Sequence, residues 1–341
     1  MEDYLAHIPE IGFVLLLLIL LVVVGAIYAT KLKASEQLWK FALEGVGDGV
    51  WDWDWDISND STHLSNRYKE IFGFSDIDIH TSTEDWNNRI HPEDAASMNE
   101  AVHDYLKGKT TKYIHEHRVI CKDKSIKWVL SRGMIVKRDN NGAPIRMVGT
   151  HADITTRKML ESKLENLAHF DTLTNLPNRT LLSDRLKIAL AYAKREKKML
   201  AVMFVNLDQF KEINDLYGHE AGDKVLKQIS QRLVTCVRES DTVARMGDDE
   251  YVVLLPIIDS ANDAYLVASK IVDEVIKPIT IEKISGDTSV IVNVSASIGI
   301  AIYPQHGKDE KLLLINADMA MYQAKSNGKN QAKVFDTAIL N

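Results

Sequence analysis

The chain has few cysteines and no excess of basic residues, and both shortages exclude classes of protein. Cys121 and Cys236 are too few for a disulfide framework or for a cysteine-based zinc site. Lysine and arginine number 41 against 48 aspartates and glutamates, so the net charge of −7 argues against a broad face for binding nucleic acid. We therefore expect reduced thiols and no nucleic-acid partner.

The length and the bulk composition fit two folded domains, with one exceptional stretch near the start. The 341 residues exceed one typical domain, and 45% hydrophobic and 26% charged residues match globular usage. Residues Ile11 to Ala29 carry no charge and as a helix would reach about 28 Å, close to the hydrocarbon thickness of a bilayer. A signal peptide or a buried helix is the alternative, but lysines follow this run from Lys31 onward instead of preceding it. We predict a transmembrane helix over residues 11–29, with residues 1–10 outside and the remainder cytoplasmic.

Residues 35–155 alternate short apolar and polar segments with turns and a few helical stretches, which predicts an α+β domain. The order of these segments resembles a PAS domain followed by its PAC tail. The resemblance rests on four segments: His91 to Asp94, Glu116 to Arg118, the strand around Trp128, and Gly149 to Lys158. It implies a role in sensing or dimerisation, and the family name alone specifies no ligand.

Aromatic and imidazole side chains in this domain are candidates for binding a cofactor. Three tryptophans on one strand face could line a flavin pocket, and three histidines could ligate haem iron; the residues are Trp51, Trp53, Trp55, His91, His115 and His117. Packing in the sheet core or at a dimer contact explains the tryptophans better, and turn or surface positions explain the histidines. We assign no cofactor to these residues, and the ligand of the PAS-like domain is left open.

The connector over residues 156–170 is charged and helical, with Leu160, Leu164 and Leu167 at spacings of four and three. A short parallel coiled coil is the favoured interpretation, and an amphipathic helix that packs on its own domain is the alternative. In the first case the PAS-like domain and this helix would form a homodimer.

Residues 171–336 alternate helical and strand patterns, and a fixed series of motifs runs along them. The motifs are Asp171 to Arg179, Asn206 to Asp223, Arg238 to Tyr251, Ser295 to Ala301 and Ala317 to Asn330. This series resembles the GGDEF family of diguanylate cyclases, and it implies a nucleotidyl-cyclase-like domain with a central β-sheet flanked by helices. The whole chain is therefore expected to be a mixed α+β and α/β protein, anchored in a bacterial inner membrane by one helix with its N-terminus outside.

The resemblance implies a reaction that joins two GTP molecules into cyclic di-GMP and two diphosphates, with Mg²⁺ or Mn²⁺ as cofactor. The family's metal positions fall on Asn206, the backbone carbonyl of Leu207, Asp249 and Glu250, of which the last two are also the catalytic positions. Asp208, the second acidic position of that segment, is present.

Two of these positions depart from the family pattern. Asn206 replaces a carboxylate, and a neutral amide is a weaker ligand for Mg²⁺. The hairpin spells Gly-Asp-Asp-Glu-Tyr, so Asp248 replaces a glycine that would avoid steric cost, and it adds negative charge near an anionic nucleotide. We predict impaired catalysis, and the alternative is that Asp248 reaches the metal and restores the missing charge.

The remaining functional positions match the family. Asn214 and Asp223 correspond to its guanine-binding pair, and Lys325 and Lys329 to its triphosphate-binding residues, with lysine where arginine is usual at 329. Arg238 and Asp241 match its inhibitory site for cyclic di-GMP.

Two hypotheses follow. In one, a degenerate GGDEF domain binds cyclic di-GMP as a receptor; in the other, the domain is an active, PAS-regulated cyclase. A phosphodiesterase is disfavoured because no second carboxylate-rich domain follows residue 336.

Overall fold

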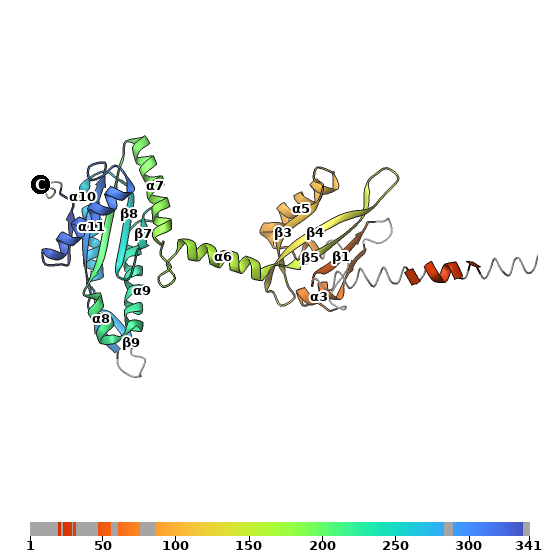
Figure 1. Cartoon of the computed structure of the whole chain (residues 1–341), viewed down its shortest axis with the longest axis horizontal. Coiled ribbons are helices and arrows are strands. Elements are labelled where there is room, and N and C mark those ends of the chain that lie inside the picture. Colours follow the sequence, from red (N-terminus) through yellow and green to blue (C-terminus); the bar gives the residue numbers. More distant parts are fainter. Residues whose placement is uncertain are drawn as a thin grey trace, which may run out of the picture. The chain divides into compact units, whose positions relative to one another are not determined.

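A computed structural model of the chain describes residues 20–21, 23–28, 30–31, 47–55, 61–75, 86–282 and 289–336. The chain divides into two compact units, Met1–Glu161 and Ser162–Asn341, each built around its own sheet (Figure 1). Most of the predicted span over residues 11–29 lies outside the described residues, as does the start of the predicted PAS-like range. Within the described ranges, no helix combines the length and the apolar character needed to cross a membrane.

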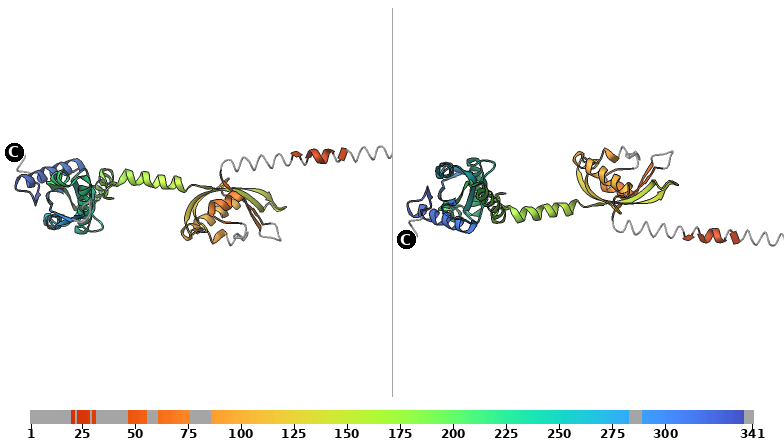
Figure 2. Two further views of the ribbon diagram at one scale, coloured as in Figure 1. Left: turned by 90° about the horizontal axis from the view of Figure 1, so that it is seen from below. Right: turned by 90° about the horizontal axis from the view of Figure 1, so that it is seen from above.

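The first unit contains a five-stranded antiparallel sheet in the order β2-β1-β5-β4-β3. Its strands are β1 (Gly49–Asp54), β2 (Ser61–Leu64), β3 (Tyr113–Ile120), β4 (Ile126–Arg138) and β5 (Pro144–Asp153). The helices α3 (Asn66–Phe72) and α5 (Pro92–Leu106) pack with this sheet (Figure 2). The predicted α+β domain is thus observed, and its strand order joins the first strand to the last.

Trp51 fills the centre of the first unit because two glycines make room for its indole ring. Gly133 and Gly149 are direct cross-strand partners on β4 and β5. A Cβ on either would lie 2.6 or 2.1 Å from atoms of the Trp51 ring. The ring centroids of Trp51 and Trp53 are 5.0 Å apart, and those of Trp53 and Trp55 are 6.0 Å apart. These contacts support packing as the role of the three tryptophans.

The helix α6 (Thr155–His169) covers the predicted connector, and none of its side chains is buried. Its first turn is fixed to the first unit, where Arg157 and Lys158 each contact Glu116 at 2.6 Å. Leu160 and Leu164 are 56% and 65% exposed, so they do not pack on their own unit. The amphipathic alternative is therefore wrong for these leucines, and the coiled coil stays a prediction.

The second unit contains a five-stranded sheet in the order β12-β11-β6-β8-β7 and a two-stranded sheet, β10-β9. The strands are β6 (Met199–Asp208), β7 (Thr242–Arg245), β8 (Glu250–Ile258), β9 (Ile279–Glu282), β10 (Ser289–Val292), β11 (Ser295–Tyr303) and β12 (Gln331–Val334). The helices are α7 (Arg179–Glu196), α8 (Phe210–Tyr217), α9 (His219–Cys236), α10 (Ala261–Val275) and α11 (Glu310–Ser326).

Helices cover both faces of this larger sheet, so its central strands are apolar on both sides. Along β6, alternate residues enter two different hydrophobic clusters: Ala201 and Met203 pack with α9 and α10, whereas Leu200 and Val202 pack with α7 and α11. The last residues of β6 lie beside the first residues of β8, because the register pairs Asn206 with Glu250. The predicted metal positions are brought together where these two strand ends meet, at one edge of the sheet.

Candidate nucleotide site at the edge of the second sheet

The ends of two neighbouring strands position the predicted metal ligands. Asn206, two residues before the end of β6, is 5% exposed and is paired in register with Glu250. The Leu207 N–H donates to the Asp249 carbonyl at 3.1 Å, and the Met246 N–H donates to the Glu250 carbonyl at 2.8 Å, which closes the hairpin between β7 and β8. These backbone bonds hold the two acidic residues against the buried amide.

Two carboxylates and one amide oxygen lie together at this edge, and burial dominates the pKa of both carboxyl groups. Burial raises the pKa of Asp249, although the charge of Lys325 opposes the shift. Burial also raises the pKa of Glu250, with further contributions from Asp249 and Asp318. The Oδ1 atom of Asn206 is buried and has no hydrogen-bond partner among the described residues. Carboxylate and amide oxygens buried together in this way are suitable ligands for a divalent cation such as Mg²⁺.

The amide at position 206 changes the charge of the site without changing its shape. The Asn206 side chain hydrogen-bonds the Asp249 carboxylate and thereby lowers its pKa, an effect smaller than that of burial. Within the described part of the chain, no group of three or more His, Cys, Asp or Glu side chains is arranged to hold a metal ion. A carboxylate at position 206 would have been the third acidic group beside Asp249 and Glu250.

The backbone of the hairpin is unstrained at Asp248. Residues with positive φ among those described include neither Gly247 nor Asp248. A Cβ on Gly247 would meet its nearest neighbour, an oxygen of Glu250, at 3.7 Å, an ordinary contact. The aspartate is therefore compatible with the backbone of this turn, and the effect of its bulk and charge on a nucleotide stays a prediction. That charge contributes to the raised pKa of Asp249.

Arg245 fixes the hairpin to the turn at Asp171, which precedes α7, a role that the sequence analysis missed. One of its guanidinium nitrogens donates to the Asp171 carboxylate at 3.0 Å and another donates to the Asp248 carbonyl at 2.9 Å. Burial raises the pKa of Asp171, but bonds from Thr174 and Arg245 outweigh it and leave this pKa below its usual value. In the sequence, only the position of an arginine two residues before the hairpin could have indicated this role.

The predicted guanine-binding residues lie where α8 meets α9. Asn214 is on α8 and is partly buried, whereas Asp223 is exposed in the first turns of α9. Gly218 joins the two helices with a φ of 82°. Gly222 precedes Asp223, and a Cβ on this glycine would be 2.0 Å from the Asn214 Oδ1 atom. Sequence reasoning missed Gly222, although a glycine inside a helical pattern often marks a close approach.

The predicted phosphate-binding lysines lie at the end of α11 and in the turn after it. Lys325, in the last turn of α11, lowers the pKa of both Asp249 and Glu250, so its charge faces the metal positions. Lys329 is exposed and has a φ of 61° in the following turn. Lys325 and the acidic hairpin therefore act on each other electrostatically, and the role of Lys329 stays a prediction.

Arg238 and Asp241 form a tight turn between α9 and β7, at the far end of β7 from the acidic hairpin. The Asp241 carboxylate accepts from the Arg238 N–H at 2.9 Å, and the Asp241 N–H donates to the Arg238 carbonyl at 3.0 Å. Both residues line a pocket of about 370 Å³ together with Asp259, Asp263 and Lys270. The exposed guanidinium is free to meet an anionic or guanine-bearing ligand.

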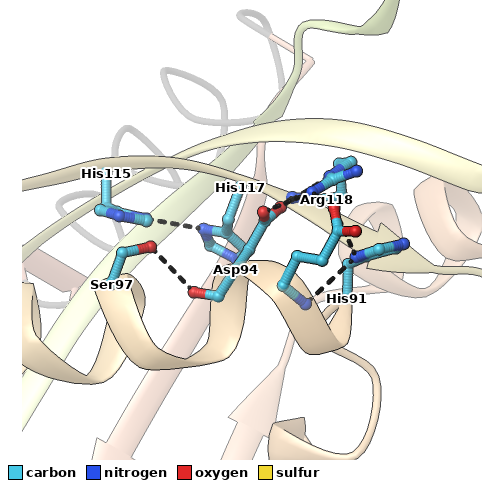
Figure 3. A network of polar contacts seen from close by, with 7 residues as sticks. His91, Asp94, Ser97, His115, His117 and Arg118 are labelled. Atoms are coloured by element: carbon cyan, nitrogen blue, oxygen red, sulfur yellow. Dashed lines mark hydrogen bonds and ion pairs between the residues drawn. The ribbon is translucent and has the colours of Figure 1, made fainter.

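The candidate histidines of the first unit have local structural roles (Figure 3). His91 caps α5 by accepting from the Glu93 N–H at 3.4 Å. His115 and His117 lie side by side on β3 with their Nδ1 atoms 3.4 Å apart, and burial lowers the pKa of His117 to about 4. Next to them, Asp94 accepts three bonds from Arg118 at 2.7 to 2.9 Å. These contacts give His91 and Asp94 structural partners and place His115 and His117 next to each other.

His151, which the sequence analysis did not single out, is buried in the core of the first unit. Its ring stacks on Trp86 with centroids 4.8 Å apart, and its Nε2 atom lies 2.9 Å from the Ser131 hydroxyl. Its other nitrogen has no partner among the described residues, and the same holds for the Trp51 Nε1 and His117 Nε2 atoms. Burial lowers the pKa of His151, so this imidazole is neutral.

Comparisons with known proteins agree with the two units. Residues 168–331 match the family model described as diguanylate cyclase, GGDEF domain, and residues 61–151 match the PAS fold. Diguanylate cyclase TpbB of Pseudomonas aeruginosa is 44% identical over 173 residues, which are 51% of this chain and 39% of that protein. The bifunctional diguanylate cyclase/cyclic di-GMP phosphodiesterase MucR of the same species is 44% identical over 177 residues, 52% of this chain and 25% of that protein.

A solved structure of the GGDEF domain of TpbB is 43% identical and covers 50% of this chain and 99% of that one, with a TM-score of 0.47. The chain spans 39% or less of the length of the two curated relatives named above. The family models define a protein that combines a PAS fold with a GGDEF domain. Residues 168–331 form a domain that belongs to the GGDEF family of diguanylate cyclases.

Proposed function

We propose that this chain is a membrane-anchored cyclic di-GMP signalling protein whose GGDEF domain binds cyclic di-GMP at Arg238 and Asp241 and turns over GTP poorly. The observation that carries the proposal is the buried amide of Asn206 at the centre of the predicted metal site. In the family reaction, each 3′-hydroxyl attacks the α-phosphate of the other nucleotide and diphosphate leaves. Divalent cations, when bound, neutralise the charge that develops on the phosphates.

The residues present would divide the work as follows. Asp249 and Glu250 would hold the cation, with the Leu207 carbonyl as an additional ligand. Asn214 and Asp223 would bind guanine, and Lys325 and Lys329 would bind the triphosphate. Only the contribution of position 206 is weakened, because an amide oxygen is neutral. A metal ion in such a site supplies several kcal/mol of transition-state stabilisation, so weaker metal binding should slow the reaction strongly.

Product binding does not depend on the weakened metal site. Arg238 and Asp241 belong to another turn and line their own pocket of about 370 Å³. A guanidinium suits phosphate and guanine edges, and a carboxylate accepts from guanine. The domain can therefore act as a receptor even where turnover is slow.

The alternative function is an active diguanylate cyclase in which Asp248 replaces the missing charge. Two observations favour it: Asp248 is compatible with the hairpin backbone, and the Asn206 Oδ1 atom is still available to a cation. In this case Asp248, Asp249 and Glu250 would together supply three carboxylates.

Anchoring and dimerisation complete the proposal. Residues 11–29 would form the inner-membrane helix, with the N-terminus outside and both domains in the cytoplasm. The exposed leucines of α6 would pair with those of a second chain as a parallel coiled coil. Residue-level accessibility of cysteines introduced before and after the span would test the orientation, and sedimentation of the full-length chain would test the dimer.

The decisive experiment measures two quantities on the purified full-length chain. Conversion of GTP into cyclic di-GMP is followed with Mg²⁺ and with Mn²⁺, and binding of cyclic di-GMP is followed by calorimetry. We expect slow conversion and clear binding. Efficient conversion would refute a function as receptor alone in favour of the cyclase, and absence of binding would refute the receptor directly.

A further inference from the structure

We propose that Asp208 is a positioning residue that fixes the turn carrying the phosphate-binding lysine Lys329. This role rests on the proposed nucleotide site and goes beyond it, because the family resemblance assigns Asp208 no task here. Asp208 is the last residue of β6, two positions after Asn206, and only 4% of it is exposed. A carboxylate buried so deeply requires hydrogen-bond donors around it.

Three donors from two other segments form hydrogen bonds with this carboxylate. The Oδ1 atom accepts from the Ser297 hydroxyl at 2.7 Å, and the Oδ2 atom accepts from the Ser295 hydroxyl at 2.6 Å. The Oδ2 atom also accepts from the backbone N–H of Asn330 at 3.2 Å. The two serines begin β11, and Asn330 directly precedes β12. One side chain therefore joins the end of β6, the start of β11 and the turn between α11 and β12.

This turn has an unusual backbone that needs external support. Gly328, Lys329 and Asn330 have φ values of 110°, 61° and 46°, three consecutive residues in the left-handed region. Side chains other than glycine rarely adopt this conformation unless the surroundings impose it. The Lys329 N–H donates to the Ala324 carbonyl at 3.0 Å, and the Gln331 amide donates to carbonyls at the end of α11. Asp208 supplies the support from the opposite side.

Direct metal binding by Asp208 does not fit these contacts. Both of its oxygens already accept hydrogen bonds, and a cation would have to compete with these donors for the carboxylate. Asn206 is different, since its Oδ1 atom has no partner in the part of the chain that the structure describes. The two residues therefore have different roles at the end of β6. Position 206 faces the metal site, and position 208 holds the turn that carries Lys329.

The test compares ligands that do and do not carry the triphosphate. The full-length chain is titrated with a GTP analogue bearing a methylene bridge between the α- and β-phosphates, with guanosine, and with cyclic di-GMP. Asp208→Ala should weaken binding of the analogue at least about tenfold, while guanosine and cyclic di-GMP bind within about twofold of the wild-type value. Asp208→Asn should retain most of the affinity, because its oxygen can accept from Asn330 and its NH₂ can donate to a serine hydroxyl.

Asp215→Ala is the matched control, because it removes the same charge from the exposed side of α8. This variant should bind all three ligands like the wild type. Equal losses for guanosine and the analogue would overturn the positioning role, as would Asp208→Asn behaving like Asp208→Ala. A wild-type chain that binds no triphosphate analogue would overturn it too, yet cyclic di-GMP binding would still test the proposed receptor function by itself.

Discussion

The Oδ1 atom of Asn214 occupies the space of the side chain that Gly222 lacks, 2.0 Å from where a Cβ would be. A Gly222→Ala variant must therefore displace Asn214 from its place in the predicted guanine site. We expect at least about a tenfold loss of affinity for a GTP analogue, measured by calorimetry. Alanine is a better helix former than glycine, so a weaker α9 would not explain the loss.

A double-mutant cycle provides the control for this prediction. If Gly222 acts only through Asn214, then Gly222→Ala should cost nothing further in an Asn214→Ala background. Gln228→Ala, at an exposed position of the same helix, should leave binding unchanged. Losses that simply add in the double variant would contradict the proposed link.

Restoring the family residues should restore catalysis. We expect Asn206→Asp to raise the rate of cyclic di-GMP synthesis at least about tenfold, since even one order of magnitude corresponds to only about 1.4 kcal/mol of barrier. Asp248→Gly in that background should raise it further by removing negative charge near the nucleotide. Product is quantified by chromatography after incubation with GTP and Mg²⁺. Asn206→Ala serves as the control and should show no gain in rate over the wild type; a rate unchanged by Asn206→Asp would favour the cyclase that uses Asp248.

Removing the guanidinium at position 238 should abolish recognition of the product. Arg238→Ala keeps the backbone bonds of the turn but removes the charged group, and we expect cyclic di-GMP affinity to fall at least about tenfold. Lys227→Ala removes the same charge from an exposed position of α9 and should have little effect. Retention of affinity in Arg238→Ala would place the binding site elsewhere.

The stability of the first unit should depend on pH through Asp94. Hydrogen bonds from Arg118 hold the pKa of Asp94 at about 2, below its value of about 4 in an unfolded chain. The unfolded chain therefore binds more protons between these pH values, so the stabilisation is present above pH 4 and is lost as the pH falls toward 2. We expect Asp94→Asn to reduce the free energy of unfolding at pH 7 by about 1 to 2 kcal/mol, allowing for partial screening by solvent.

Tryptophan fluorescence during urea unfolding of the full-length chain measures this effect selectively. All six tryptophans precede residue 129, so their signal reports the first unit and not the second. The difference between Asp94→Asn and the wild type should shrink as the pH approaches 2. Glu100→Gln, on the exposed side of α5, is the control. A difference independent of pH would mean that Asp94 acts through packing and not through its charge.

The sequence predicted the folds well because their patterns are local, and it predicted the site contacts less well because these are not. The motif at Asn206 follows an apolar strand, so its position at a strand end could be inferred. The packing of Asn214 on Gly222 and the three donors to Asp208 come from segments that only the tertiary fold brings together. One sequence contains no φ angles, so it could not show that the backbone at Asp248 is unstrained.

The two hydrogen bonds of the Arg245 guanidinium link the end of α6 to the acidic loop. Asp171 follows closely after α6 ends, and Asp248 is at the tip of the hairpin, so one guanidinium holds the exit of the helix and the acidic loop at a fixed separation. The backbone N–H of Arg245 also donates to Pro177 in the same entry turn. Rotation of the last turn of α6 must therefore either move the acidic loop with it or break the two hydrogen bonds of the Arg245 guanidinium.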